Sequence, residues 1–118
     1  MTYIDGFLCP VKPGRKDDYL KMAQDAAPLF LEYGATRVVE TWNDDLMEGK
    51  TNDFRTAVIA EDGEDVVFSW IEWPDKAARD KGWAGIMQDE RMKGPDDNPM
   101  SGARLIYGGY SVILDKSA

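Results

Sequence analysis

Histidine is absent from this chain of 118 residues, and Cys9 is its single cysteine. The lack of histidine excludes Ser-His and Cys-His nucleophile pairs, histidine-ligated zinc and a haem held by a proximal histidine. A single cysteine cannot form a disulfide within the chain, which fits a reducing compartment. Any acid–base chemistry must therefore use Asp, Glu, Lys, Tyr, Arg or water.

Basic residues are few compared with acidic ones. The chain has 14 Lys and Arg against 22 Asp and Glu, which gives a formal net charge of −8. Such a surface repels phosphate backbones and anionic lipids, so we expect neither a nucleic-acid nor a membrane partner. Apolar runs also fall short of the ~20 residues that span a bilayer, and the N-terminus lacks a signal pattern. The expected location is cytoplasmic.

Aromatic residues, by contrast, are plentiful: there are four Trp, five Tyr and four Phe. They serve either to pack a core or an interface, or to line a cavity. The length and a hydrophobic content of 43% predict one globular domain over residues 1–118. Solvated loops explain the acidic residues Asp44, Asp45, Asp96 and Asp97 better than a bound cation does. No metal site and no cofactor are therefore predicted.

The predicted order of elements is strand, helix, strand, strand, helix, strand. The strands are expected at residues 3–9, 35–42, 66–73 and 104–114, and the helices at 15–33 and 75–88. Pro28 lies within the first helix and predicts a kink there. An additional strand at residues 54–60 is expected to form a hairpin with 66–73, because Asp62-Gly63 is a strong two-residue turn signal.

The strand at 66–73 is apolar on both faces. Val66, Phe68 and Trp70 point to one side, and Val67, Ile71 and Trp73 point to the other. The order of elements is that of the split βαβ, ferredoxin-like α+β fold, in which right-handed crossovers place two helices on one face of an antiparallel sheet. The opposite face would stay bare, so we expect a homodimer that buries this sheet face.

Several motifs resemble those of one bacterial family. They are Tyr-Ile-Asp-Gly-Phe at 3–7, Gly-Lys-Thr at 49–51 with Phe54, Val-Phe-Ser-Trp at 67–70, Arg79-Asp80, and Arg-Leu-Ile-Tyr-Gly-Gly-Tyr at 104–110. Together they are similar to the YbaA-like family, domain-of-unknown-function family 1428. The resemblance spans nearly the whole chain and implies the dimeric α+β barrel superfamily. It implies no established activity, and no catalytic residue can be carried over.

Two kinds of function remain open. The first is a cofactor-independent enzyme acting on a small organic molecule, and the second is a non-catalytic dimer that binds a small molecule or serves a stress response. In either case a ligand cavity is expected between the sheet and the helices. The candidate cavity residues are Asp5, Ser69, Trp70, Arg79, Arg104 and Tyr107.

Most of these candidates also have a simpler explanation. A carboxylate in the position of Asp5 is either a strand residue facing water or an acid in a cavity. Ser69 would bond Thr56 across the predicted hairpin, and Arg79 would pair with Asp75 one helical turn earlier. Arg104 would end a strand at the surface.

Overall fold

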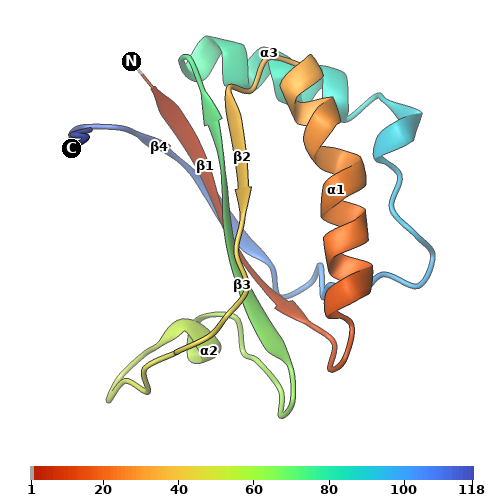
Figure 1. Cartoon of the computed structure of the whole chain (residues 1–118), viewed down its shortest axis with the longest axis vertical. Helices are drawn as coiled ribbons and strands as arrows, with labels where there is room; N and C mark the ends of the chain where they lie inside the picture. The colour runs from red at the N-terminus through yellow and green to blue at the C-terminus, as the bar shows by residue number, and fades with distance from the viewer. Residues whose placement is uncertain (1) are drawn as a thin grey trace.

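The computed structural model describes residues 2–118, and Figure 1 shows the arrangement of its elements. The elements are β1 (Tyr3–Val11), α1 (Lys16–Glu32), β2 (Arg37–Glu40), α2 (Phe54–Ala57), β3 (Asp65–Trp73), α3 (Lys76–Ile86), a 3-10 turn (Glu90–Met92) and β4 (Ile106–Ser111). The strands form one antiparallel sheet in the order β2-β3-β1-β4, and α1 and α3 cover one of its faces. The predicted ferredoxin-like α+β fold is confirmed.

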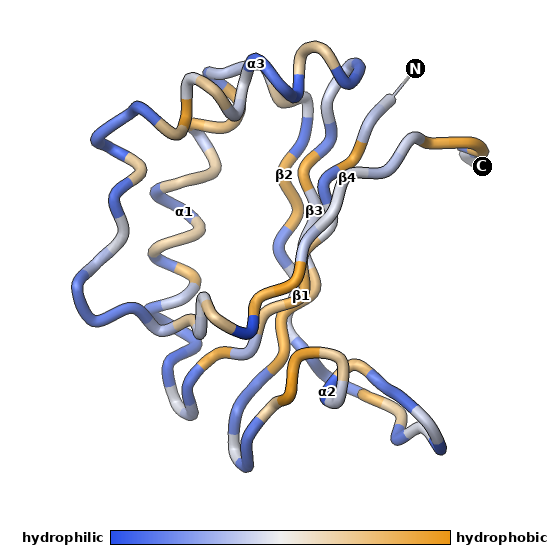
Figure 2. Tube along the Cα trace, turned by 180° about the vertical axis from the view of Figure 1, so that it is seen from behind, coloured by the Kyte–Doolittle hydropathy of each residue, from blue (hydrophilic) through white to orange (hydrophobic). Residues whose placement is uncertain are grey.

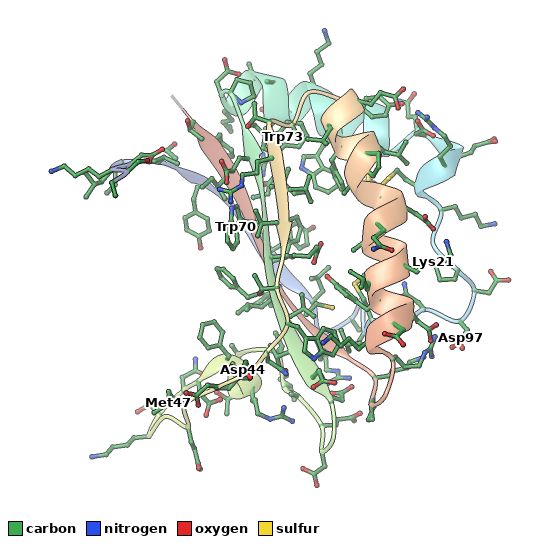
Figure 3. All side chains as sticks on the ribbon, in the orientation of Figure 1. Lys21, Asp44, Met47, Trp70, Trp73 and Asp97 are labelled. Carbon is green, nitrogen blue, oxygen red and sulfur yellow. The ribbon has the colours of Figure 1, made fainter. Side chains whose placement is uncertain are left out.

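Strand β3 lies inside the sheet, between β1 and β2. Its residues Val67, Ser69, Ile71 and Trp73 are buried beneath the helices, whereas Phe68 on the other face is 46% exposed. Figure 3 shows Trp73 and Trp70 on opposite sides of this strand. Figure 2 shows apolar residues along the strands of the sheet. The expected two apolar faces are therefore present, and the helices cover only one of them.

Helix α1 forms where the first helix was predicted and continues as one helix through Pro28. Asp17 and Asp18 lie in its first turn, where carboxylates interact favourably with the helix dipole. Gly34, at φ 109°, takes the left-handed conformation just after the helix. The core beneath α1 and α3 centres on Phe30, Ala35, Ile71, Trp73 and Ile86.

The predicted strand at 54–60 is wrong. Phe54–Ala57 is a short helix, and its N-cap is Asp53. The Asp53 side chain accepts a hydrogen bond from the Thr56 backbone N–H, while the Thr56 hydroxyl accepts one from the Asp53 backbone N–H. This capping box stabilises a helical turn at that point. Along Ser69–Glu72, β3 is paired on both sides, with β1 and β2. Further along, the Thr41 hydroxyl donates to the Phe68 carbonyl and the Asn43 side chain accepts from the Val66 N–H, so these side chains occupy the edge that a further strand would need.

The remaining boundaries differ from the predictions by a few residues. Strand β1 continues past Cys9 to Val11, because the carbonyl of Pro10 accepts a hydrogen bond from Ser101 N–H at 3.1 Å. The Asp62-Gly63 turn forms, with Gly63 at φ 81°, but it connects α2 to β3. The segment carrying α2 projects from the sheet on the side away from α1 (Figure 1). Within residues 2–118, no helix has the length and apolar character needed to cross a membrane.

Candidate functional site

A cavity of about 290 Å³ lies between the helical layer and the sheet. We call it the interlayer cavity. Its lining residues are Phe7, Cys9, Tyr19, Met22, Ala23, Ala26, Ala27, Phe30, Val38, Glu40, Ser69, Ile71, Trp83, Met92, Gly94, Asn98, Met100 and Leu105. The three alanines come from α1, where their small side chains leave the space open. The lining is mostly apolar with a few polar groups, as is typical of small-molecule sites.

The polar groups of the interlayer cavity gather where β2 meets β3. Glu40 lies directly opposite Ser69, and Ser69 lies directly opposite Phe7 of β1, so these three side chains share the helix-facing side. The Tyr19 hydroxyl, from α1, donates a hydrogen bond of 2.5 Å to Oε1 of Glu40. Ser69 lies near both Tyr19 and Glu40 and acts to lower the pKa of each. A tyrosine, a serine and a carboxylate thus converge at one end of the cavity.

Desolvation is the main cause of the raised pKa values of Glu40, Tyr19 and Cys9. Glu40 ends β2 at the rim of the cavity and is exposed to solvent. Partial desolvation of its carboxylate against α1 still raises its pKa above the ordinary value, while the hydrogen bonds from Tyr19 and Ser69 act in the opposite direction. Burial is also the main reason that the pKa of Tyr19 is raised, and the nearby Glu40 charge adds to it. Burial raises the pKa of the Cys9 thiol to about 11. Tyr19 and Cys9 are therefore neutral at physiological pH, and Glu40 is the titratable acid of the site.

A second polar cluster adjoins the cavity and is centred on Asp5, which is 2% exposed. Its carboxylate accepts hydrogen bonds from Trp73 Nε1 at 3.0 Å, Trp83 Nε1 at 2.8 Å and Arg79 Nε at 3.0 Å. Arg79 Nη2 adds an ion-pair contact of 2.9 Å. Because the Asp5 oxygens are fully engaged, this carboxylate holds the Trp83 indole in place as a wall of the cavity.

The other candidate residues lie outside the cavity. Arg104 makes a bidentate pair with the buried Glu64, at 2.6 and 2.7 Å. Trp70 lies on the uncovered face of the sheet and donates a hydrogen bond of 2.9 Å to Glu72. Tyr107 is 73% exposed on the edge strand β4, where its ring stacks on Phe7 with centroids 6.2 Å apart.

Ser69 is thus the one member of the predicted set that lines the cavity, with Asp5 and Arg79 directly behind its wall. The simpler explanations for three of them do not hold. Asp5 is buried rather than facing water, and Arg79 pairs with Asp5 and Asp80 rather than Asp75. The bond from Ser69 to Thr56 disappears with the predicted hairpin.

Glu40 and Tyr19 are the cavity residues that the sequence reasoning missed. Glu40 follows Val38 by two positions in a short strand, so alternation places it on the same, helix-facing side. Tyr19 lies in the first predicted helix and is one of its buried residues. The missing information was tertiary. The register between β2 and β3 places Glu40 beside Ser69, and the packing of α1 on the sheet brings Tyr19 to Glu40.

The uncovered face of the sheet carries a wide groove of about 750 Å³. We call this surface the open sheet face; its side chains are Ile4, Leu8, Phe68, Trp70, Ile106 and Tyr110. Gly6 and Gly108 lie side by side in its middle row and leave the groove without side chains there. The C-terminal residues Ile113 and Leu114 also border it and are 93% and 74% exposed. In the part of the chain that the structure describes, no three acidic or cysteine side chains gather as metal ligands.

The fold and the interlayer cavity define this chain as a small ferredoxin-like α+β protein with a cavity between its layers. Residues 2–102 match the model of the family described as a protein of unknown function, DUF1428. The uncharacterized protein YbaA of Escherichia coli K12 is 50% identical over 117 residues, which cover 98% of this chain and all of that protein. YbaA of Shigella flexneri matches to the same extent. The chain therefore belongs to the DUF1428 family, as its strand motifs indicated.

A solved structure from Bacillus cereus shares the fold. Its protein carries the provisional name antibiotic biosynthesis monooxygenase. The two structures superpose with a TM-score of 0.62 over 99% of this chain and 96% of the other, at 14% sequence identity. At that level of identity the likeness concerns the fold alone.

Proposed function

We propose that this chain is a cytoplasmic homodimer in which each subunit binds a small organic molecule in the interlayer cavity. The observation that carries the proposal is the convergence of Tyr19, Glu40 and Ser69 on an otherwise apolar cavity. A polar group set of this kind orients a ligand, while the apolar walls supply most of the binding energy. A purely structural core would fill this volume with side chains instead.

The homodimer is supported by the open sheet face. Phe68, Ile106 and Tyr110 are 46%, 45% and 68% exposed there, and they are contiguous along the strands. Apolar patches of this size on a small protein mark interaction sites. A second copy covers such a face with two-fold symmetry, because each sheet then presents the same residues to the other. The interlayer cavity lies on the opposite face and stays free for a ligand.

An enzymatic version of the proposal is favoured by Glu40. A partly desolvated carboxylate with a raised pKa, held by a tyrosine hydroxyl, is suited to take a proton from a bound molecule without any cofactor. An enzyme and a binding protein are distinguished by what happens to the bound ligand. An enzyme changes the mass of the ligand or the rate at which the ligand exchanges protons, and Glu40→Gln abolishes this change while binding remains measurable. A pure binding protein returns the molecule unchanged.

The binding proposal is tested by screening small aromatic fragments with ligand-observed NMR. We expect a subset of fragments to bind the natural protein and to lose binding in Ala23→Leu, because the larger side chain projects from α1 into the cavity. Leucine is a good helix former, so the helix itself tolerates the change. The matched control is Gln24→Leu, on the exposed side of the same helix turn.

The control variant is expected to bind the same fragments as the natural protein. Loss of binding in both variants, or in neither, would place the fragments outside the interlayer cavity. A screen without hits would contradict the binding proposal itself.

A further inference from the structure

The interlayer cavity is lined by charge of one sign only. Glu40 is the only acidic residue among the lining residues, and neither lysine nor arginine lines the cavity. Among residues 2–118, no basic side chain lies within ion-pair distance of the Glu40 carboxylate. Its partners are the neutral hydroxyls of Tyr19 and Ser69. A negative charge therefore stands at the polar end of an apolar cavity without a positive counterpart.

Basic side chains do occur nearby, in a surface hollow that shares Met22 and Met92 with the cavity. Most of them are already paired with carboxylates. Arg15 contacts Asp18 and Asp97, Lys21 contacts Asp25, and Arg91 contacts Asp89 and Glu32. These pairs hold the three side chains outside the cavity, and Lys93, the fourth basic residue of the hollow, does not line the cavity either. An anionic ligand would therefore lose its hydration without gaining an ion-pair partner.

The walls of the cavity suit an organic cation. Phe7, Phe30 and Trp83 line it together, with the Phe30 and Trp83 rings edge to face at 5.2 Å and the Phe7 and Trp83 rings at 6.4 Å. Aromatic faces attract a positive charge through their quadrupoles, and the attraction grows when water is excluded. The net charge of −8 adds a long-range attraction for cations.

We propose that the ligand of the interlayer cavity is a small hydrophobic amine. Its ammonium group pairs with Glu40, for which no lysine or arginine side chain of the cavity competes. Its apolar body lies among the rings of Phe7, Phe30 and Trp83. This inference rests on the proposed function, because it assumes that the cavity holds a ligand. It adds the chemical class of that ligand and the residue that selects it.

The test uses three probes of the same shape and different charge: 2-phenylethylamine, 2-phenylethanol and phenylacetate. Their affinities for the natural protein are measured by titration calorimetry in about 0.15 M salt, where long-range attraction is largely screened. We expect the amine to bind at least about tenfold more tightly than the alcohol, because a charge-assisted hydrogen bond is stronger than a neutral one. Phenylacetate is expected to bind least of the three.

Glu40→Gln separates the local charge from the overall charge. It keeps the shape of the side chain and removes the charge, so we expect the affinity for the amine to fall by about tenfold or more and that for the alcohol to stay the same. Glu48→Gln is the matched control. It makes the same change at an exposed position away from the cavity and should leave all three affinities unchanged.

Each outcome decides between the two proposals. Equal binding of amine and alcohol, or tighter binding of phenylacetate, overturns the amine and leaves a cavity that binds small molecules. Amine binding that Glu40→Gln does not weaken also overturns the proposal, because the ammonium group then lies elsewhere. If none of the three probes binds while the fragment screen yields hits, the amine class is overturned and the proposed function stands. If neither yields binding, both fail.

Discussion

Asp5 is the most tightly held polar residue beside the cavity. It is buried on β1, and it accepts hydrogen bonds from two tryptophan indoles and from Arg79. Gly109 on the neighbouring strand makes this possible: a Cβ there would lie 2.6 Å from Arg79 Nη2 and 2.5 Å from the Tyr3 hydroxyl. A buried carboxylate surrounded in this way stabilises one arrangement of the ring that borders the cavity.

Replacing Asp5 by alanine is expected to lower the free energy of unfolding by about 3–5 kcal/mol. The change leaves the Arg79 guanidinium partly buried without its partner, which costs more than the pair itself contributes. Asp5→Ala combined with Arg79→Ala should recover part of this loss in a urea-denaturation cycle. Asp80→Ala removes the exposed partner of Arg79 and serves as the control, with an expected loss below about 1 kcal/mol. Equal losses at Asp5 and Asp80 would contradict this interpretation.

Glu64 and Arg104 form a pair whose contribution depends on pH. The hydrogen bonds from Arg104 hold the pKa of Glu64 at about 2, below the ordinary value of 4.5. The folded state therefore binds this proton less readily than the unfolded state does. The stabilisation is fully present above about pH 4.5 and is lost as the pH falls towards 2.

We expect the difference in unfolding free energy between the natural protein and Glu64→Gln to be largest at neutral pH. It should shrink steadily in urea titrations at progressively lower pH, because protonation of Glu64 in the natural protein mimics the variant. The exposed Glu61→Gln is the control, with a change below about 0.5 kcal/mol. A difference that stays constant down to about pH 3 would show that Glu64 is not held by its charge.

At the scale of single residues, the sequence could indicate which residue types form the site but not which side chains contact one another. Ser69 was correctly assigned to the strand that borders the cavity. Glu40 could not be recognised, because its role depends on contacts with Tyr19, 21 positions away, and on the register of β2 against β3. Arg104 carried no signal for its partner Glu64, since the loop geometry between α2 and β3 brings the two together.

Among the elements, α3 packs closely against its neighbours because it has glycine at two contact positions. Gly82 and Gly85 lie against Trp73 and Tyr33, and the helix lies close to the sheet for that reason. The contacts with Trp73 and Tyr33 explain these glycines by tight packing. Asp75 is the N-cap of α3 and accepts a hydrogen bond from the Ala78 N–H at 2.7 Å.

Gly82→Ala is expected to destabilise the protein although alanine is the better helix former. The added Cβ would lie 2.4 and 2.7 Å from two ring carbons of Trp73 and 2.9 Å from the Tyr33 carbonyl oxygen. Overpacking of this kind outweighs the helix-propensity gain of ~1 kcal/mol, for a net loss of roughly 1–2 kcal/mol. Gly102→Ala, with no atom within 4 Å of the new Cβ, should change the thermal midpoint little. A stabilised Gly82→Ala would contradict the packing described for α3.

The order of elements could be predicted because hydrophobic periodicity and glycine or proline signals agree along most of the chain. The exception was Phe54–Ala57, where apolar residues beside a strong turn signal favoured a strand. Local capping by Asp53 and Thr56, and the occupation of the second edge of β3 by β2 and by the side chains of Thr41 and Asn43, decided the outcome. The second of these is a property of the whole sheet and cannot be predicted from the segment itself.

At the scale of the whole molecule, the two faces of the sheet have different surroundings. The helices and the interlayer cavity occupy one face, and the open sheet face occupies the other. Separation of the two allows a ligand and a second subunit to bind at the same time. The proposed dimer and the proposed cavity can therefore be tested independently.

Phe68→Glu is expected to prevent dimerisation, because it places a charge in the apolar groove of the open sheet face, which the proposed dimer would bury. Light scattering at micromolar concentration should give twice the chain mass of 13.3 kDa for the natural protein and a single chain mass for the variant. Met87→Glu is the control, since Met87 is 79% exposed just after α3, away from that groove. A natural protein that scatters as a monomer contradicts the dimer.

The central claim, that the interlayer cavity binds a small molecule, is tested most directly by chemical-shift mapping on ¹⁵N-labelled protein with the three phenyl probes. The tryptophans report on separate surfaces: Trp83 lines the cavity, whereas Trp70 lies on the open sheet face. We expect at least one probe to shift the Trp83 indole signal and the backbone amides of Tyr19, Glu40 and Ser69, and to leave the Trp70 indole unchanged. Shifts confined to Trp70 and its neighbours on the open sheet face would contradict the claim. So would the absence of shifts both with these probes and with every hit of the fragment screen.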